Sequence, residues 1–104
     1  MKVLPLQTPF KPRGSDGWTF TIQARTGDVA LVSKTHPDVP RTAWEVHVIQ
    51  RHDGYEINGK AIEAGESLAS TTSFGKCAWA PADEAAARAR FDEVAASEAA
   101  KEAA

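Results

Sequence analysis

The chain has 104 residues, 42% of them hydrophobic and 25% charged, a composition that fits one globular domain. Its net charge of −2 argues against a dedicated nucleic-acid binder, because such proteins usually carry a strong basic excess. The single cysteine, Cys77, excludes an intramolecular disulfide and favours a reducing setting.

Three prolines and two glycines interrupt residues 1–17, which predicts an irregular N-terminal arm. This segment lacks the apolar run of a signal peptide, and no stretch of the sequence has the length and apolarity of a membrane span. We therefore expect a cytoplasmic protein that does not contact a membrane.

Residues 18–24 alternate between apolar and polar side chains, which is typical of a strand with one buried face. The apolar members are Trp18, Phe20, Ile22 and Ala24. A tight turn at residues 26–28 leads into a second strand at 29–34. Because this connection is too short for a crossover, the two strands should pair antiparallel.

Residues 35–42 contain two prolines and are expected to form a loop before a third strand at 43–50. Residues 51–54 should turn the chain. Asn58 and Gly59 separate two short runs at 55–57 and 60–62, and Asn-Gly in this position strongly favours a β-hairpin. Residues 64–75 read as irregular, and 76–79 as a short edge strand.

The residue composition changes at Pro81, after which the sequence is rich in alanine and has no further proline or glycine. Pro81 suits the first turn of a helix. Ala87, Phe91 and Val94 lie at helical spacing on one face. The apolar stripe ends near Ala95, so residues 97–104 are expected to fray as an acidic, alanine-rich tail.

Together these elements predict an α+β fold, a twisted antiparallel sheet of four to five strands with one C-terminal helix packed on one face. Residues 18–96 should form the single domain. We expect the helix to place Phe91 and Val94 on the sheet face that bears four apolar side chains, namely Phe20, Ile22, Trp44 and Val46.

A spaced series of short motifs resembles a group of short, uncharacterised proteins encoded by bacteriophages and prophages. The series comprises Gly27-Asp28-Val29-Ala30-Leu31, Trp44-Glu45-Val46, Val48-Ile49-Gln50-Arg51, Ile57, Gly59, Ser70, Phe74-Gly75, Ala78-Trp79 and Phe91. The likeness covers about residues 20–94, and residues 64–72 depart from it because they lack a proline and a further aromatic residue. The resemblance implies a mobile-element origin and no known activity. By analogy alone, small phage proteins often bind a host protein, as the anti-CRISPR class does.

Cys77 with His36, His47 and His52 is the only set that suggests nucleophilic or metal chemistry. A nucleophile needs a base within hydrogen-bond reach, and a structural zinc site usually shows two closely spaced ligand pairs. Only His47 and His52 have such a spacing, and no second pair accompanies them. We therefore predict no catalytic residues, no metal site and no cofactor.

Residues of the 51–60 hairpin region are the best candidates for a contact surface, because Trp, Tyr and Arg dominate binding hot spots. The predicted binding residues are Arg51, His52, Tyr55, Lys60 and Trp79. The sequence thus favours a small non-catalytic protein-binding module of mobile-element origin, whose partner is a protein or protein complex of the bacterial host cell and whose binding could inhibit it.

The alternative is a protein that binds or mimics nucleic acid. Arg51, His52, Lys60 and Lys76 with Tyr55 would form a modest basic and aromatic patch. Residues 80–104 carry six acidic and three basic residues, which could imitate phosphates. The oligomeric state is left open.

Overall fold

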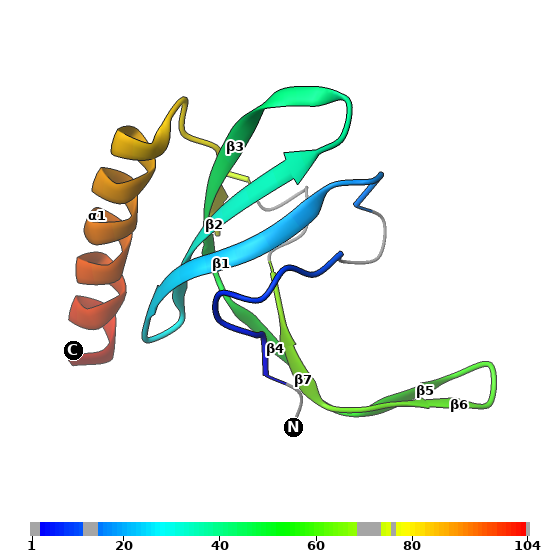
Figure 1. The fold of residues 1–104 in the computed structure, drawn as a ribbon. Helices are drawn as coiled ribbons and strands as arrows, with labels where there is room; N and C mark the ends of the chain where they lie inside the picture. Colours follow the sequence, from blue (N-terminus) through cyan, green and yellow to red (C-terminus); the bar gives the residue numbers. More distant parts are fainter. Residues whose placement is uncertain (1–2, 12–14, 69–73, 76, 104) are drawn as a thin grey trace.

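The computed structural model describes residues 3–11, 15–68, 74–75 and 77–103 (Figure 1). It confirms the α+β class. A four-stranded antiparallel sheet in the order β1-β2-β3-β8 carries one long helix on one face (Figure 1). These elements are β1 (Thr19–Thr26), β2 (Val29–His36), β3 (Val39–Val48), β8 (Ala78–Trp79) and α1 (Glu84–Ala103).

Strands β1, β2 and β3 form a meander joined by tight turns. Gly27 opens the first turn with a φ of 58°, a conformation that glycine adopts without steric cost. The second turn is shorter than expected, because β2 continues to His36 and β3 begins at Val39. Most of the loop predicted at residues 35–42 is therefore strand.

The sheet face beneath α1 holds one hydrophobic cluster. Val29, Leu31 and Val46 are fully buried there, and Ala87 and Val94 of α1 pack against them. Partly buried side chains complete the cluster, namely Ala24, Trp44, Val48, Trp79, Phe91 and Ala95. The predicted apolar stripe of the helix therefore packs on the sheet.

Phe20 and Ile22 do not share this face, which corrects the prediction. They lie in a second cluster on the opposite side of the sheet, with Ala30, Val32 and Ile49. The physical cause is a β-bulge in β1 at Gln23: Ile22 pairs with Val32, whereas Ala24 pairs with Leu31. One extra residue shifts the following side chains to the other face, so Ala24, unlike Phe20 and Ile22, reaches the helix side.

The N-terminal arm covers this second cluster. The Gln7 amide donates to the Ile22 carbonyl at 2.8 Å, and Phe10 and Phe20 exchange two backbone hydrogen bonds of 2.9 and 2.8 Å. Leu4 and Phe10 pack on the cluster. Both faces of the sheet are thus covered, one by a helix and one by an extended segment.

Helix α1 begins after Asp83, whose carboxylate accepts a hydrogen bond of 2.8 Å from the Ala86 amide, as an N-cap residue does. The helix continues to Ala103, through most of the segment where the sequence predicted a frayed tail. Alanine has the highest helix propensity, and Lys101 pairs with Glu98 at 3.2 Å in the last turns. These local terms extend the helix past its apolar stripe.

Two small ribbons lie beyond the main sheet. Strand β4 (Gln50–His52) pairs with β7 (Gly65–Ser67), and β5 (Tyr55–Ile57) pairs with β6 (Lys60–Ile62). The β5–β6 hairpin projects from the body of the molecule on the side away from α1 (Figure 1). Residues 51–52 and 65–67 are therefore strands, where the sequence predicted a turn and irregular chain.

Candidate protein-binding surface

The β5–β6 hairpin turns at Asn58 and Gly59, as predicted. Their φ angles of 50° and 77° are both positive, which is the requirement of the two-residue turn that matches the twist of the flanking strands. Asparagine and glycine tolerate this conformation better than other residues. The turn therefore fixes the register of the hairpin.

One face of this hairpin presents apolar side chains to solvent. Tyr55 is 49% exposed and Ile57 is 51% exposed. Directly opposite them in the ladder stand Ile62 and Lys60, and residues that pair directly share a face of the ribbon. We call Tyr55, Ile57, Lys60 and Ile62 the hairpin face.

His52 extends the aromatic part of this face toward the body of the protein. Its ring lies edge-on to Tyr55, with 5.7 Å between the ring centroids and 72° between the planes. This arrangement is a favourable one for aromatic pairs, and it orients the Tyr55 side chain. An aromatic anchor with restricted rotamers loses less entropy on binding.

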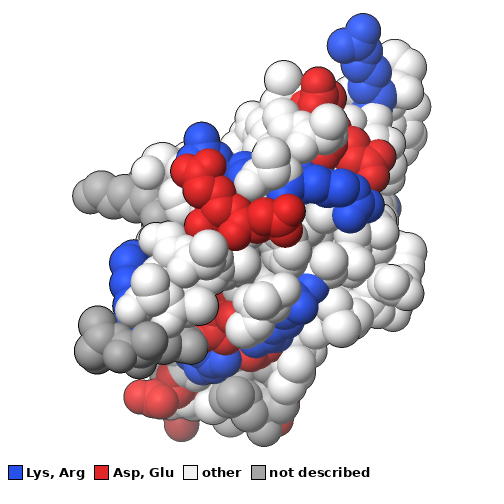
Figure 2. Space-filling view, turned by 90° about the vertical axis from the view of Figure 1, so that its left-hand side faces the viewer, with Lys and Arg blue, Asp and Glu red and all other residues white. Residues whose placement is uncertain are grey.

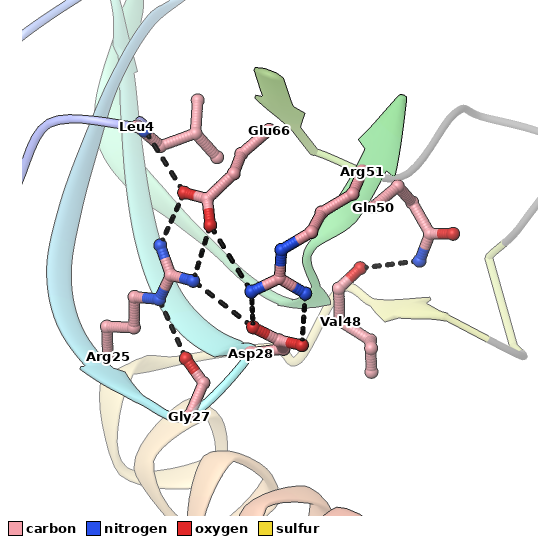
Figure 3. Close-up of polar contacts among 8 residues, drawn as sticks. All are labelled: Leu4, Arg25, Gly27, Asp28, Val48, Gln50, Arg51 and Glu66. Carbon is pink, nitrogen blue, oxygen red and sulfur yellow. Dashed lines mark hydrogen bonds and ion pairs between the residues drawn. The ribbon is translucent and has the colours of Figure 1, made fainter. Parts of the chain in front are cut away.

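At the base of the hairpin unit, four charged side chains form a network that we call the arginine–carboxylate network: Arg25, Asp28, Arg51 and Glu66 (Figure 3). Arg51 donates to both carboxylate oxygens of Asp28, at 2.6 and 2.5 Å. Arg25 donates to both oxygens of Glu66, at 2.7 and 2.8 Å. Bidentate pairs of this kind fix geometry as well as adding energy.

The network joins parts of the chain that are distant in sequence. Arg25 is near the end of β1 and Asp28 is in the β1–β2 turn, whereas Arg51 is in β4 and Glu66 in β7. The Leu4 amide adds a hydrogen bond of 3.3 Å to Glu66 (Figure 3). The ribbon that carries the hairpin is therefore clamped to the main sheet and to the N-terminal arm.

The same contacts hold the carboxylates in their charged form. The hydrogen bond from Arg51 lowers the pKa of Asp28, and the hydrogen bond from Arg25 lowers the pKa of Glu66. The hydrogen bond to Glu66 in turn raises the pKa of Arg25. The network is thus fully ionised at neutral pH.

Four of the five predicted binding residues lie on this unit. Arg51 and His52 are in β4, Tyr55 is in β5, and Lys60 begins β6. Arg51 is only partly available to a partner, because its guanidinium already serves Asp28. The proposed nucleic-acid patch included Lys76, which lies outside the described residues.

Trp79 is the predicted residue that the structure places elsewhere. It lies in β8, opposite Val46 in the ladder, and is partly buried in the cluster beneath α1. Arg90 of α1 stands over its ring at 5.8 Å from the centroid. Trp79 therefore contributes to packing between the sheet and the helix.

Ile57, Asp28 and Glu66 belong to this surface or its base but are absent from the residues predicted from the sequence. The signal available for Ile57 was its position two residues after Tyr55 in the strand before the Asn-Gly turn, which places both side chains on one face. No local pattern marks Asp28 and Glu66, because their partner Arg51 lies 23 and 15 positions away.

A second polar group is buried in the sheet. Glu45 accepts hydrogen bonds from Lys34 at 2.9 Å and shares one with the His47 ring at 2.7 Å. Burial acts to raise the pKa of Glu45, but the hydrogen bonds from His47 and Lys34 outweigh it and the pKa falls below its ordinary value. His47 is 2% exposed, so its ring is closed to any substrate.

Histidine and cysteine side chains do not converge on a metal. Among residues 3–11, 15–68, 74–75 and 77–103, no group of three or more His, Cys, Asp or Glu side chains has the geometry to hold an ion. Within the same ranges no helix is long and apolar enough to cross a membrane.

The outer face of α1 carries interspersed charges of both signs (Figure 2). Three carboxylates pair with basic residues one turn away: Glu84 with Arg88, Glu93 with Arg90, and Glu98 with Lys101. Such pairs reduce the resemblance of this helix to a row of phosphates. The charge pattern is that of a solvated helix face.

No protein-family model, curated protein or solved structure matches this chain.

Proposed function

We propose that this protein is a non-catalytic protein-binding module that contacts its partner through the hairpin face. The observation that carries the proposal is the exposure of Tyr55 and Ile57, each about one half, on a hairpin that projects from the body (Figure 1). Aromatic and branched apolar side chains lose water favourably at an interface.

The base of the hairpin unit supports the proposal. The arginine–carboxylate network holds β4 and β7 to the main sheet, so the hairpin is presented from a fixed platform. A contact element that is held in place before binding loses less conformational entropy when its partner arrives. The edge-on contact between the Tyr55 and His52 rings at the root of the hairpin adds to this preorganisation.

The partner class follows from the resemblance to phage and prophage proteins. We propose that the partner is a protein of a bacterial host cell and that binding inhibits it. A small protein without a catalytic centre acts on a host target by occupying a functional surface, and a protruding hairpin suits a cleft in that target.

Affinity capture from a bacterial lysate tests the proposal. The full chain, tagged at its C-terminus, is compared with the double variant Tyr55→Ala/Ile57→Ala, each with and without nuclease. We expect one protein or complex in stoichiometric amount with the wild type and at least about tenfold less with the variant, since hot-spot residues contribute about 2 kcal/mol each.

The matched control is Glu56→Ala, which alters the opposite face of the same hairpin. Its capture should equal that of the wild type. Equal capture by all three proteins would contradict the hairpin face as the contact surface. Capture that disappears with nuclease would instead favour the nucleic-acid alternative.

A further inference from the structure

Strand β3 has an open edge along its first half. Strand β8 pairs with β3 at Val46 and His47, which lie opposite Trp79 and Ala78. β3 itself begins seven residues earlier, at Val39. Among the described residues no strand pairs with β3 on this side between residues 39 and 45.

Pro81 explains why β8 stops where it does. Continuing the antiparallel register from the Val46–Trp79 pair would set Pro81 opposite Trp44. Proline has no N–H to donate, so the ladder cannot continue at this position. The Val48 amide donates to the Cys77 carbonyl at 2.7 Å. Because backbone groups alternate along a strand, the Trp44 N–H and C=O point to the same open edge.

A groove of about 320 Å³ borders this edge. Residues 41–45 line it without a gap, and residues 80–82 form part of its rim. Trp18 and Lys34 complete the lining on the other side of β3, so the groove extends from this edge over the neighbouring strand β2.

The lining of the groove combines apolar surface with one unbalanced positive charge. Trp18, Val39, Trp44 and Pro81 supply apolar side chains. Glu45 is neutralised within the lining by Lys34, at 2.9 Å. Arg41 is exposed, and none of the described ion pairs includes it.

We propose that this groove binds an extended acidic segment of another protein, which adds a strand to the free edge of β3. The backbone of the segment would pair with the edge at Trp44, one carboxylate would meet Arg41, and apolar side chains would lie against Trp44 and Pro81. Pro40 has no N–H to donate, so an added strand would pair with β3 on the Trp44 side of this residue.

This surface is distinct from the hairpin face and does not depend on it. The hairpin face belongs to β5 and β6, whereas the groove belongs to β3 and the segment before α1. The two surfaces therefore allow independent tests.

The test selects ligands from a displayed library of random 12-residue peptides on the immobilised full chain. A selected peptide is then titrated against wild type, Arg41→Glu and the control Lys101→Glu, which reverses an exposed charge near the end of α1. We expect acidic peptides, a loss of at least about tenfold in affinity for Arg41→Glu, and no change for Lys101→Glu or for Tyr55→Ala/Ile57→Ala.

Backbone N-methylation of the peptide tests strand addition itself. Because only alternate amides of an added strand face β3, methylating one alternate set should weaken binding about tenfold and methylating the other set should leave it unchanged. Equal effects of both sets would overturn the proposal. So would a failure to select peptides, equal binding to Arg41→Glu, or a concentration-dependent dimer that Arg41→Glu abolishes, which would assign the edge to a second copy.

Discussion

At the scale of single residues, the arginine–carboxylate network contains charged side chains that differ widely in burial. The Glu66 side chain is 4% exposed, whereas Arg51 is 48% exposed. Removing one partner from a buried charged pair leaves the other charge poorly solvated. Glu66 should therefore be the most sensitive member of the network, and Arg51 the least.

The substitution Glu66→Gln tests this ranking. It keeps the shape of the side chain but removes the charge that Arg25 pairs with, so we expect the free energy of unfolding to fall by about 2 kcal/mol. Urea denaturation measures the change. Glu93→Gln on the exposed face of α1 is the control and should lie within about 0.5 kcal/mol of wild type. Equal effects of the two substitutions would contradict a stabilising role of the arginine–carboxylate network.

The lowered pKa values of Asp28 and Glu66 predict a pH dependence with a definite sign. Both groups bind protons more readily in the unfolded chain, so their stabilisation is complete above the ordinary carboxyl pKa of about 4. It is lost as the pH falls through the lower pKa values of the folded state. Urea unfolding between pH 7 and pH 3 should show a decline below about pH 5. Asp28→Asn/Glu66→Gln should have lower stability at pH 7 and a shallower decline.

Local patterns in the sequence were sufficient to identify Tyr55 and the Asn58-Gly59 turn. They were insufficient for Asp28 and Glu66, because ion pairs across 23 to 41 positions leave no local signal. Trp79 was predicted as a binding residue from its residue type. In the structure it lies between the sheet and the helix and packs against the hydrophobic cluster.

At the scale of elements, a single bulge decides which residues face the helix. Residues 18–24 alternate without interruption, so the sequence gives no sign that Gln23 is an extra residue in the ladder. The alternation predicted the strand correctly and the face incorrectly. The bulge frees Phe20 and Ile22 to meet the N-terminal arm, and the short Ala24 fills the space near the helix.

Two glycines provide a matched comparison of the elements. Gly27 and Gly59 both have positive φ, at 58° and 77°, and a Cβ on either would meet no atom within 4 Å. Alanine at each position therefore imposes backbone strain of about 1 kcal/mol without a clash. Gly27→Ala should lower the global free energy of unfolding by about that amount, because the β1–β2 turn belongs to the core sheet.

Gly59→Ala should leave the global stability unchanged, because β5 and β6 pair with each other and with no other strand in the part of the chain that the structure describes. The strain should appear as faster amide hydrogen exchange at residues 55–62. If Gly59→Ala lowered the global stability as much as Gly27→Ala, the hairpin would be part of the cooperative core and our description of it would be wrong.

At the scale of the whole molecule, the residues that stabilise the fold and the residues proposed to bind the partner lie in different parts of the structure. The core lies between α1, the four-stranded sheet and the N-terminal arm, whereas the hairpin projects beyond it (Figure 1). Tyr55→Ala/Ile57→Ala should thus unfold at a urea midpoint close to that of wild type. A large shift in the midpoint would mean that these side chains serve the fold rather than a partner.

The function of the alanine-rich segment cannot be inferred from its composition alone. The acidic excess of residues 80–104 suggested a phosphate mimic, but three of its carboxylates are paired on the helix surface (Figure 2). The acidic excess is therefore better explained by a solvated helix surface than by mimicry of nucleic acid.

Site-specific photo-crosslinking tests the central claim most directly. A photoreactive phenylalanine analogue replaces Ile57 on the hairpin face or Glu56 on the opposite face, and each full-length protein is irradiated in nuclease-treated bacterial lysate. Our account predicts a crosslink to one discrete protein from position 57 and little or none from position 56. Equal crosslinking from both positions, or none from position 57, would contradict the claim that the hairpin face binds the partner.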